Sequence, residues 1–241
     1  MLSSLRTFCI PACVAGVSRS LGRSVMLAAA FSLAVVSASH AHLVWLEELP
    51  DKGLVLRFGD LGGKIETSPG YLDSIPDSPA FYLGEKGPEL ARATRGKDGI
   101  TYEKATSAAP LFADLMLNVR PPRTADAPPS RTIYHARWFV PGVEAAAKPQ
   151  MDLDIVPAGE DKLQVVFRGK PLAETKVSVE EPGGGKQDLA TDKDGYVTFK
   201  PTKPGLSLVI VRKREDLAGT FRGAPYAVTS HVAVLSWNLA K

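Results

Sequence analysis

Short runs of β-branched and aromatic residues, separated by turn residues, are the feature that most restricts how this chain can fold. Beyond residue 42 they follow one another almost without interruption, divided by glycine, proline and aspartate at the spacing of strands and turns. The best candidates are residues 42–46, 53–58, 132–140, 163–167, 175–179, 196–199, 207–211 and 226–237. Because neither heptads nor alternating strands and helices are present, the pattern predicts an all-β fold.

The distribution of turn residues along the chain predicts two domains. Residues 42–141 are expected to form an N-terminal β domain, residues 142–150 a linker, and residues 151–241 a C-terminal domain. About seven short strands in about 90 residues are typical of an immunoglobulin-like β-sandwich, so we expect two such sandwiches. Alanines within residues 105–113 predict a short helix, and the prolines of residues 121–130 predict an irregular loop.

The first 41 residues have the order of a secretory signal peptide. Three arginines precede an apolar run over residues 26–36, which is too short for the about 20 residues that span a bilayer. Small residues then lead to a cleavage site after Ala41, with cuts after Ser39 or Ala38 as alternatives. We expect residues 1–41 to be removed and the mature protein to be periplasmic or secreted, with no permanent membrane anchor.

The predicted signal peptide also contains both cysteines, Cys9 and Cys13. The mature chain would therefore have no disulfide, no thiolate metal ligand and no cysteine nucleophile. The net charge of +3 belongs to the same segment, because its three arginines are the excess over 26 acidic residues. A neutral mature chain gives no electrostatic support to a nucleic-acid partner.

The four histidines are the candidate metal ligands. His42, His135 and His231 lie in predicted strands, and His40 lies at the predicted cleavage site. Imidazole is a common protein ligand for nickel, copper, cobalt and zinc, and no cysteine competes with it in the mature chain. Cleavage after Ala41 would leave His42 with a free α-amine, so that its two nitrogens and a histidine from another strand could bind one ion. Each histidine also has an ordinary interpretation as a hydrogen-bonded strand residue.

Two other patterns predict structural roles. Trp45, Trp138 and Trp237 lie in apolar strands, so we expect them in the core rather than stacked on a sugar or a haem. The segment 192–195 resembles part of a calcium loop, but the further ligands and the glutamate at position twelve are missing. It is expected to be a turn.

The sequence contains no motif for a methionine copper site and no motif for catalysis. Met26 belongs to the predicted signal peptide, and Met116 and Met151 are too few and too scattered to predict a methionine copper site. A nucleophile elbow and a zinc-protease motif are both absent. We expect no enzymatic activity.

A stretch of the C-terminal half resembles a known β-sandwich signature. It reads Gly169-Lys-Pro-Leu-Ala, then Val177-Ser-Val, then Thr191-Asp-Lys-Asp-Gly-Tyr-Val-Thr-Phe199, and finally Pro204-Gly-Leu-Ser-Leu208. The signature is similar to that of transthyretin-like and carboxypeptidase-regulatory-like modules. The resemblance implies a sandwich of this type for the C-terminal domain.

The two ends of the mature chain resemble a bacterial periplasmic family of unknown function. His40-Ala-His-Leu-Val-Trp-Leu-Glu47 is similar to the family's H-x-x-W-L-E start, and His231-Val-Ala-Val-Leu235 to its H-x-A-x-L run. Members are often labelled as a nickel-uptake substrate-specific component. The resemblance implies a soluble accessory protein that binds or delivers a transition metal for nickel, cobalt, copper or iron uptake, with a membrane transporter or receptor component as its partner.

A second function is compatible with the same sequence. The chain could be a non-catalytic β-sandwich interaction module that partners a transporter or an outer-membrane receptor. Convergence of His42 with His135 or His231 on one point would favour metal binding. Histidines more than about 10 Å apart and separately hydrogen-bonded would favour the interaction module, because bonds to an ion are only about 2 Å long.

Overall fold

The computed structural model describes residues 42–84, 87–122, 124–143 and 147–240, and these are almost entirely β. The predicted signal peptide and His40 lie outside the described residues. A short 3₁₀ helix, η1 (Tyr71–Ser74), separates the second and third strands. In the ranges described, no helix has the length and apolar character needed to cross a membrane. The predicted all-β sandwich class is confirmed.

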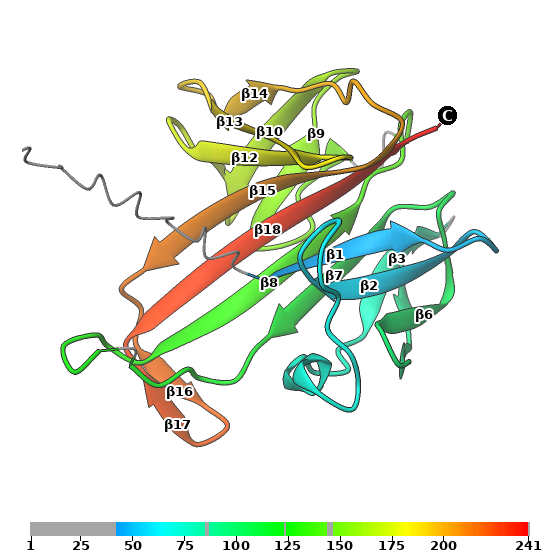
Figure 1. Ribbon diagram of the computed structural model, residues 1–241. Coiled ribbons are helices and arrows are strands. Elements are labelled where there is room, and N and C mark those ends of the chain that lie inside the picture. Colours follow the sequence, from blue (N-terminus) through cyan, green and yellow to red (C-terminus); the bar gives the residue numbers. More distant parts are fainter. Residues whose placement is uncertain (1–41, 85–86, 123, 144–146, 241) are drawn as a thin grey trace, which may run out of the picture. The chain divides into compact units, whose positions relative to one another are not determined.

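An eight-stranded sheet forms the centre of the fold, and its long strands β15, β18 and β8 run side by side (Figure 1). Neighbouring strands are antiparallel except β18 and β8, which are parallel. In order across the sheet the strands are β13 (Gly185–Ala190), β12 (Lys176–Glu181), β15 (Gly205–Glu215), β18 (Val228–Leu239), β8 (Ser130–Trp138), β7 (Leu111–Met116), β3 (Ala80–Gly84) and β4 (Gly87–Ala91).

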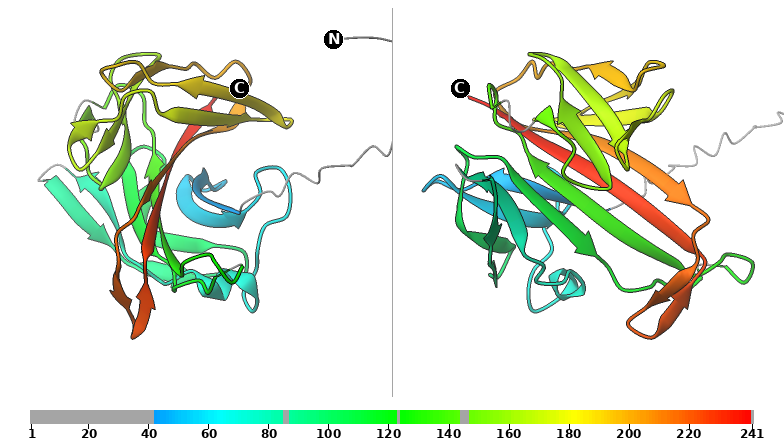
Figure 2. Two further views of the ribbon diagram at one scale, coloured as in Figure 1. Left: turned by 90° about the vertical axis from the view of Figure 1, so that its left-hand side faces the viewer. Right: turned by 180° about the vertical axis from the view of Figure 1, so that it is seen from behind.

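Two smaller sheets accompany the central one. The first contains β1 (Leu43–Glu48), β2 (Gly53–Gly59), β6 (Ile100–Thr106) and β5 (Ala93–Arg95). The second contains β11 (Lys170–Pro171), β10 (Lys162–Phe167) and β14 (Tyr196–Thr198), and β9 (Leu153–Pro157) also pairs with β10. A hairpin of β16 (Gly219–Phe221) and β17 (Ala224–Tyr226) extends from the end where β15 finishes (Figure 2).

The two faces of the central sheet bury two different cores. Because successive strand residues point to opposite faces, Val232 and Val234 of β18 join the core that includes β1 and β2. Ala233 and Leu235 of the same strand join the core that includes β9 and β10. Full burial of one such large apolar side chain contributes about 1.5–3 kcal/mol. The fold therefore has three layers, with β15 and β18 covered on both faces.

The expectation of two separate domains is not confirmed. All the described residues belong to one compact unit. The sandwich expected for residues 151–241 is present. One of its two sheets is the central sheet, which continues through the parallel pair of β18 and β8 into the first predicted domain. The described parts of residues 142–150 connect β8 to β9 without a strand of their own. Parallel pairing of strands far apart in the sequence leaves no local signal, which is why the shared sheet was not expected.

The short helix expected within residues 105–113 is wrong. This segment contains the end of β6 and the start of β7. Ala105 and Ala113 serve as small core residues, and Ala113 is fully buried between the central sheet and the first smaller sheet. Along β7 the outward positions include Asp114 and Met116, so the true period of this segment is two rather than that of a helix.

Three smaller expectations are confirmed. Trp45, Trp138 and Trp237 are all buried in the two cores. Asp192 Oδ1 accepts the backbone N–H groups of Asp194 and Tyr196 at 2.9 and 2.8 Å, as turn chemistry requires. The described residues of the expected loop at 121–130 contain no strand before Ser130, which begins β8.

Candidate functional site

Four polar residues on neighbouring strands of the central sheet form a continuous row, which we call the polar row: Asp114 on β7, His135 on β8, His231 on β18 and Glu215 on β15. Asp114 Oδ1 lies 2.7 Å from His135 Nδ1, and His135 Nε2 lies 2.9 Å from His231 Nδ1. His231 Nε2 lies 3.3 Å from Glu215 Oε2, which is ion-pair range, but no aligned hydrogen bond reaches this nitrogen from the described part of the chain.

Strand register explains why these residues meet. Asp114 lies opposite His135, and His231 lies opposite Ile133, which is two residues before His135 on β8. Residues two apart in a strand share a face, so the row occupies one face of the sheet. The His135 and His231 side chains are only 2 % and 1 % exposed, whereas that of Asp114 is 46 % exposed. The row therefore begins at an exposed carboxylate and continues beneath the smaller sheet that contains β10.

The two imidazole rings of the row lie edge to edge. Their planes differ by 6° and their centroids are 5.2 Å apart. Parallel rings stacked face to face would keep all their atoms about 3.5 Å apart or more, so nitrogens 2.9 Å apart require the rings to share nearly one plane. One of the two nitrogens, His135 Nε2 or His231 Nδ1, therefore donates a hydrogen bond to the other. Because a carboxylate only accepts hydrogen bonds, His135 Nδ1 donates to Asp114.

The pKa of His231 is lowered from its ordinary value. Burial of the ring contributes most, because it disfavours the charged form, and positive charge on His135 adds to it. Glu215 and Asp152 act in the opposite direction, and Arg168 lowers the pKa further. His231 therefore resists taking up a second proton beside His135.

This lowered pKa predicts a loss of stability in mild acid. Below about pH 6.5 the unfolded chain binds a proton at His231 that the folded chain resists, so the free energy of unfolding falls as the pH falls. Between pH 7.5 and 5.5 we expect His231 to account for a loss of up to about 1.4 kcal/mol. Urea unfolding at both pH values measures it. A His231→Gln variant should show a smaller loss than the parent, and parallel losses would contradict the assignment.

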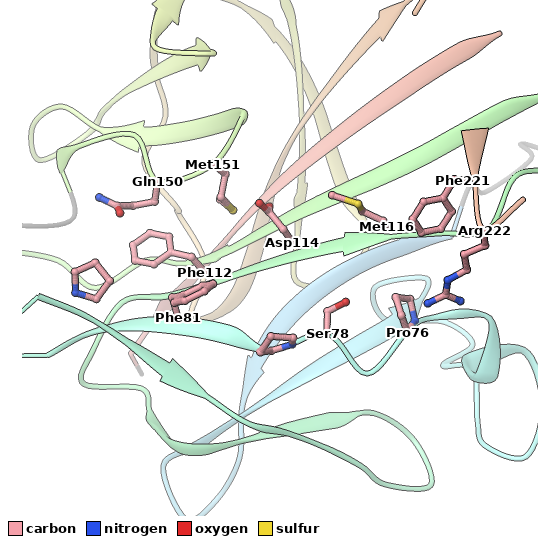
Figure 3. A pocket seen from close by; sticks show the side chains of 12 residues that line it. Pro76, Ser78, Phe81, Phe112, Asp114, Met116, Gln150, Met151, Phe221 and Arg222 are labelled. Carbon is pink, nitrogen blue, oxygen red and sulfur yellow. The ribbon is translucent and has the colours of Figure 1, made fainter. Parts of the chain in front are cut away.

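Asp114 lies at a pocket of about 500 Å³ (Figure 3). Met116 comes from β7, and Met151 comes from the segment that precedes β9. In the view of Figure 3 the Asp114 carboxylate lies between these two methionines. The walls are largely apolar and include Phe81 and Phe112. The pocket thus combines the Asp114 carboxylate and two thioethers with apolar walls, and Ser78, Gln150 and Arg222 also line it.

His42 lies on the opposite face of the central sheet. Its Nε2 atom is 2.7 Å from Glu66 Oε1, and its ring lies 5.4 Å from that of Phe58. The Tyr134 hydroxyl donates to the His42 backbone oxygen at 2.9 Å. Because Tyr134 and His135 are adjacent in one strand, they point to opposite faces. The structure therefore brings His135 and His231 together and keeps His42 apart from them.

Sequence reasoning missed Asp114 and Glu215 as neighbours of the histidines. The outward positions of β7, which place Asp114 and Met116 on one face, were present in the sequence but were obscured by the alanines around them. Glu215 closes a long strand and has no distinguishing pattern. Among the described residues, no three His, Cys, Asp or Glu side chains are grouped so that they could hold a metal ion. A metal site at this pocket would therefore need other donor types.

No family model matches the chain, and no curated protein matches it. The resemblance of its two ends to a periplasmic metal-uptake family therefore stays a prediction.

Proposed function

We propose that this protein is a periplasmic or secreted accessory protein that binds or delivers a transition metal, and that the ion binds at the pocket where the polar row ends. The observation that carries the proposal is the buried pair of His135 and His231, which is hydrogen-bonded to the exposed carboxylate of Asp114. A membrane transporter or receptor component is the partner that this function requires.

The energetics of the polar row support a functional interpretation. Burial of two imidazoles has a desolvation cost, and apolar side chains would fill the same strand positions without it. A carboxylate that binds a metal is usually held by a hydrogen bond from a residue behind it, which fixes its orientation. His135 holds Asp114 in this way at 2.7 Å.

Metal titration of the full chain tests the proposal. Cys9 and Cys13 are changed to serine, because thiolates would bind the same ions. We expect at least one of Ni(II), Co(II), Cu(II), Zn(II) and Cu(I) to bind in a 1:1 ratio and more tightly than millimolar. An Asp114→Asn variant should weaken this binding at least about tenfold, since even a residue behind a ligand contributes about 10–100-fold. Calorimetry and competition with chelators measure the affinities.

His42→Ala is the matched control. His42 lies on the other face of the sheet, so its replacement should leave the affinity unchanged. The proposal is wrong if no ion binds more tightly than millimolar, or if Asp114→Asn binds like the parent. In either case the non-catalytic interaction module becomes the better description of the protein.

A further inference from the structure

We propose that Asp114, Met116 and Met151 form a site for a soft monovalent metal ion, with Cu(I) as the ion in question. This inference rests on the proposed function and names the class of metal that the pocket would take.

Two of the methionines in this chain lie at the same pocket. The chain has four methionines, and Met1 and Met26 fall in the predicted signal peptide. The remaining two, Met116 and Met151, are separated in the sequence but line the same pocket. The sequence expectation that they are too scattered for a copper site therefore does not hold in space. Met116 is 42 % exposed, so part of this residue faces solvent.

His135 holds one of the two carboxylate oxygens of Asp114. Its Oδ1 atom accepts the hydrogen bond from His135. No hydrogen bond or ion pair within the described ranges engages its Oδ2 atom. Asp114 and Met116 are two residues apart on β7, so they point to the same face. All three residues line the same pocket, and in the view of Figure 3 the carboxylate lies between the two methionines.

The donor set selects the metal. Thioether sulfur is a soft ligand that favours Cu(I), whereas nickel, cobalt and zinc favour imidazole nitrogen. Imidazole is not offered here, because both nitrogens of His135 are engaged, one by Asp114 and the other by His231. One carboxylate oxygen supplies the charge that a monovalent cation needs. Phe112 forms part of an apolar wall that limits the access of water, which also tunes the affinity of a metal site.

Cu(I) competition tests the site. The full chain with Cys9→Ser and Cys13→Ser is titrated anaerobically in ascorbate against a chromogenic Cu(I) chelator. We expect the Met116→Leu, Met151→Leu double variant to bind Cu(I) at least about 100-fold more weakly, at the upper end of the about 10–100-fold that loss of an outer-shell partner produces. Leucine conserves volume and removes only the sulfur, so the variant keeps the pocket filled. Phe81→Leu is the matched control, since it changes a wall that offers no donor, and its affinity should equal that of the parent.

A second measurement needs no substitution in the pocket. The same cysteine-free chain carries ¹³C in its methionine methyl groups and is titrated with Ag(I), a stable analogue of Cu(I), in chloride-free buffer. We expect two of the four methyl signals to shift and to saturate at one equivalent. Unshifted signals, or a double variant that binds Cu(I) as tightly as the parent, would overturn this inference while leaving the proposed function intact. If no ion binds the parent at all, the proposed function fails as well.

Discussion

Replacement of Asp154 by alanine is expected to lower the free energy of unfolding by about 3–5 kcal/mol. Asp154 and Arg137 form a fully buried ion pair, with side chains 0 % and 1 % exposed. Arg137 Nε donates to Asp154 Oδ1 at 2.8 Å, and a second bond joins Arg137 to Asp154 Oδ2. The substitution leaves the guanidinium buried without this carboxylate. It also removes the acceptor of the backbone N–H groups of Gln150 and Ile155.

Asp152→Ala is the matched control for this effect. Asp152 lies two residues earlier and its side chain is 58 % exposed, 3.6 Å from Arg168. Exposed ion pairs contribute about 0–1 kcal/mol, so this variant should unfold close to the parent in urea. A loss below about 1 kcal/mol for Asp154→Ala would contradict the expected role of the pair. A large loss would support a single cooperative unit, because Arg137 belongs to the first predicted domain and Asp154 to the second.

The fold could be predicted from the sequence where its signals are local. The strands at residues 53–58 and 163–167 have clear β patterns flanked by turn residues, and both were expected close to their true limits. The pairing of β18 with β8 could not be predicted in this way, because parallel pairing is specified by packing on both faces of the sheet rather than by a turn. The same pairing joins two expected domains into one sheet.

In the candidate site, too, some features have a local sequence signal and others have none. His135 and His231 could be selected as residues of interest because imidazole is rare in this chain and suits metal chemistry. Their separation of 2.9 Å could not be predicted, since it depends on the parallel pairing of their strands. The sequence alone predicts no copper site at Met116 and Met151, because it shows them only as two methionines far apart in the chain. Their common pocket arises where the segment before β9 lies beside the face of β7.

Replacement of Trp237 by alanine is the second substitution for which we expect a loss of about 3–5 kcal/mol. The Trp237 ring lies edge-on to Phe139 and Phe199, with centroids 4.6 and 5.9 Å apart. Phe139 follows β8 and Phe199 follows β14, so the indole joins the central sheet to the smaller sheet that contains β10. Alanine leaves a cavity that the surrounding strands cannot close, because each is held in register by its neighbours.

Phe81→Ala separates the effect of burial from the effect of losing an aromatic ring. Phe81 is 47 % exposed at the pocket, so its truncation should change the free energy of unfolding by about 0.5 kcal/mol or less. Urea unfolding followed by far-ultraviolet circular dichroism suits both variants, since it does not depend on tryptophan fluorescence. Equal losses in the two variants would contradict the assignment of Trp237 to the core. A selective loss at Trp237 would instead support its place in the second core, which lies on the same face of the central sheet as His231.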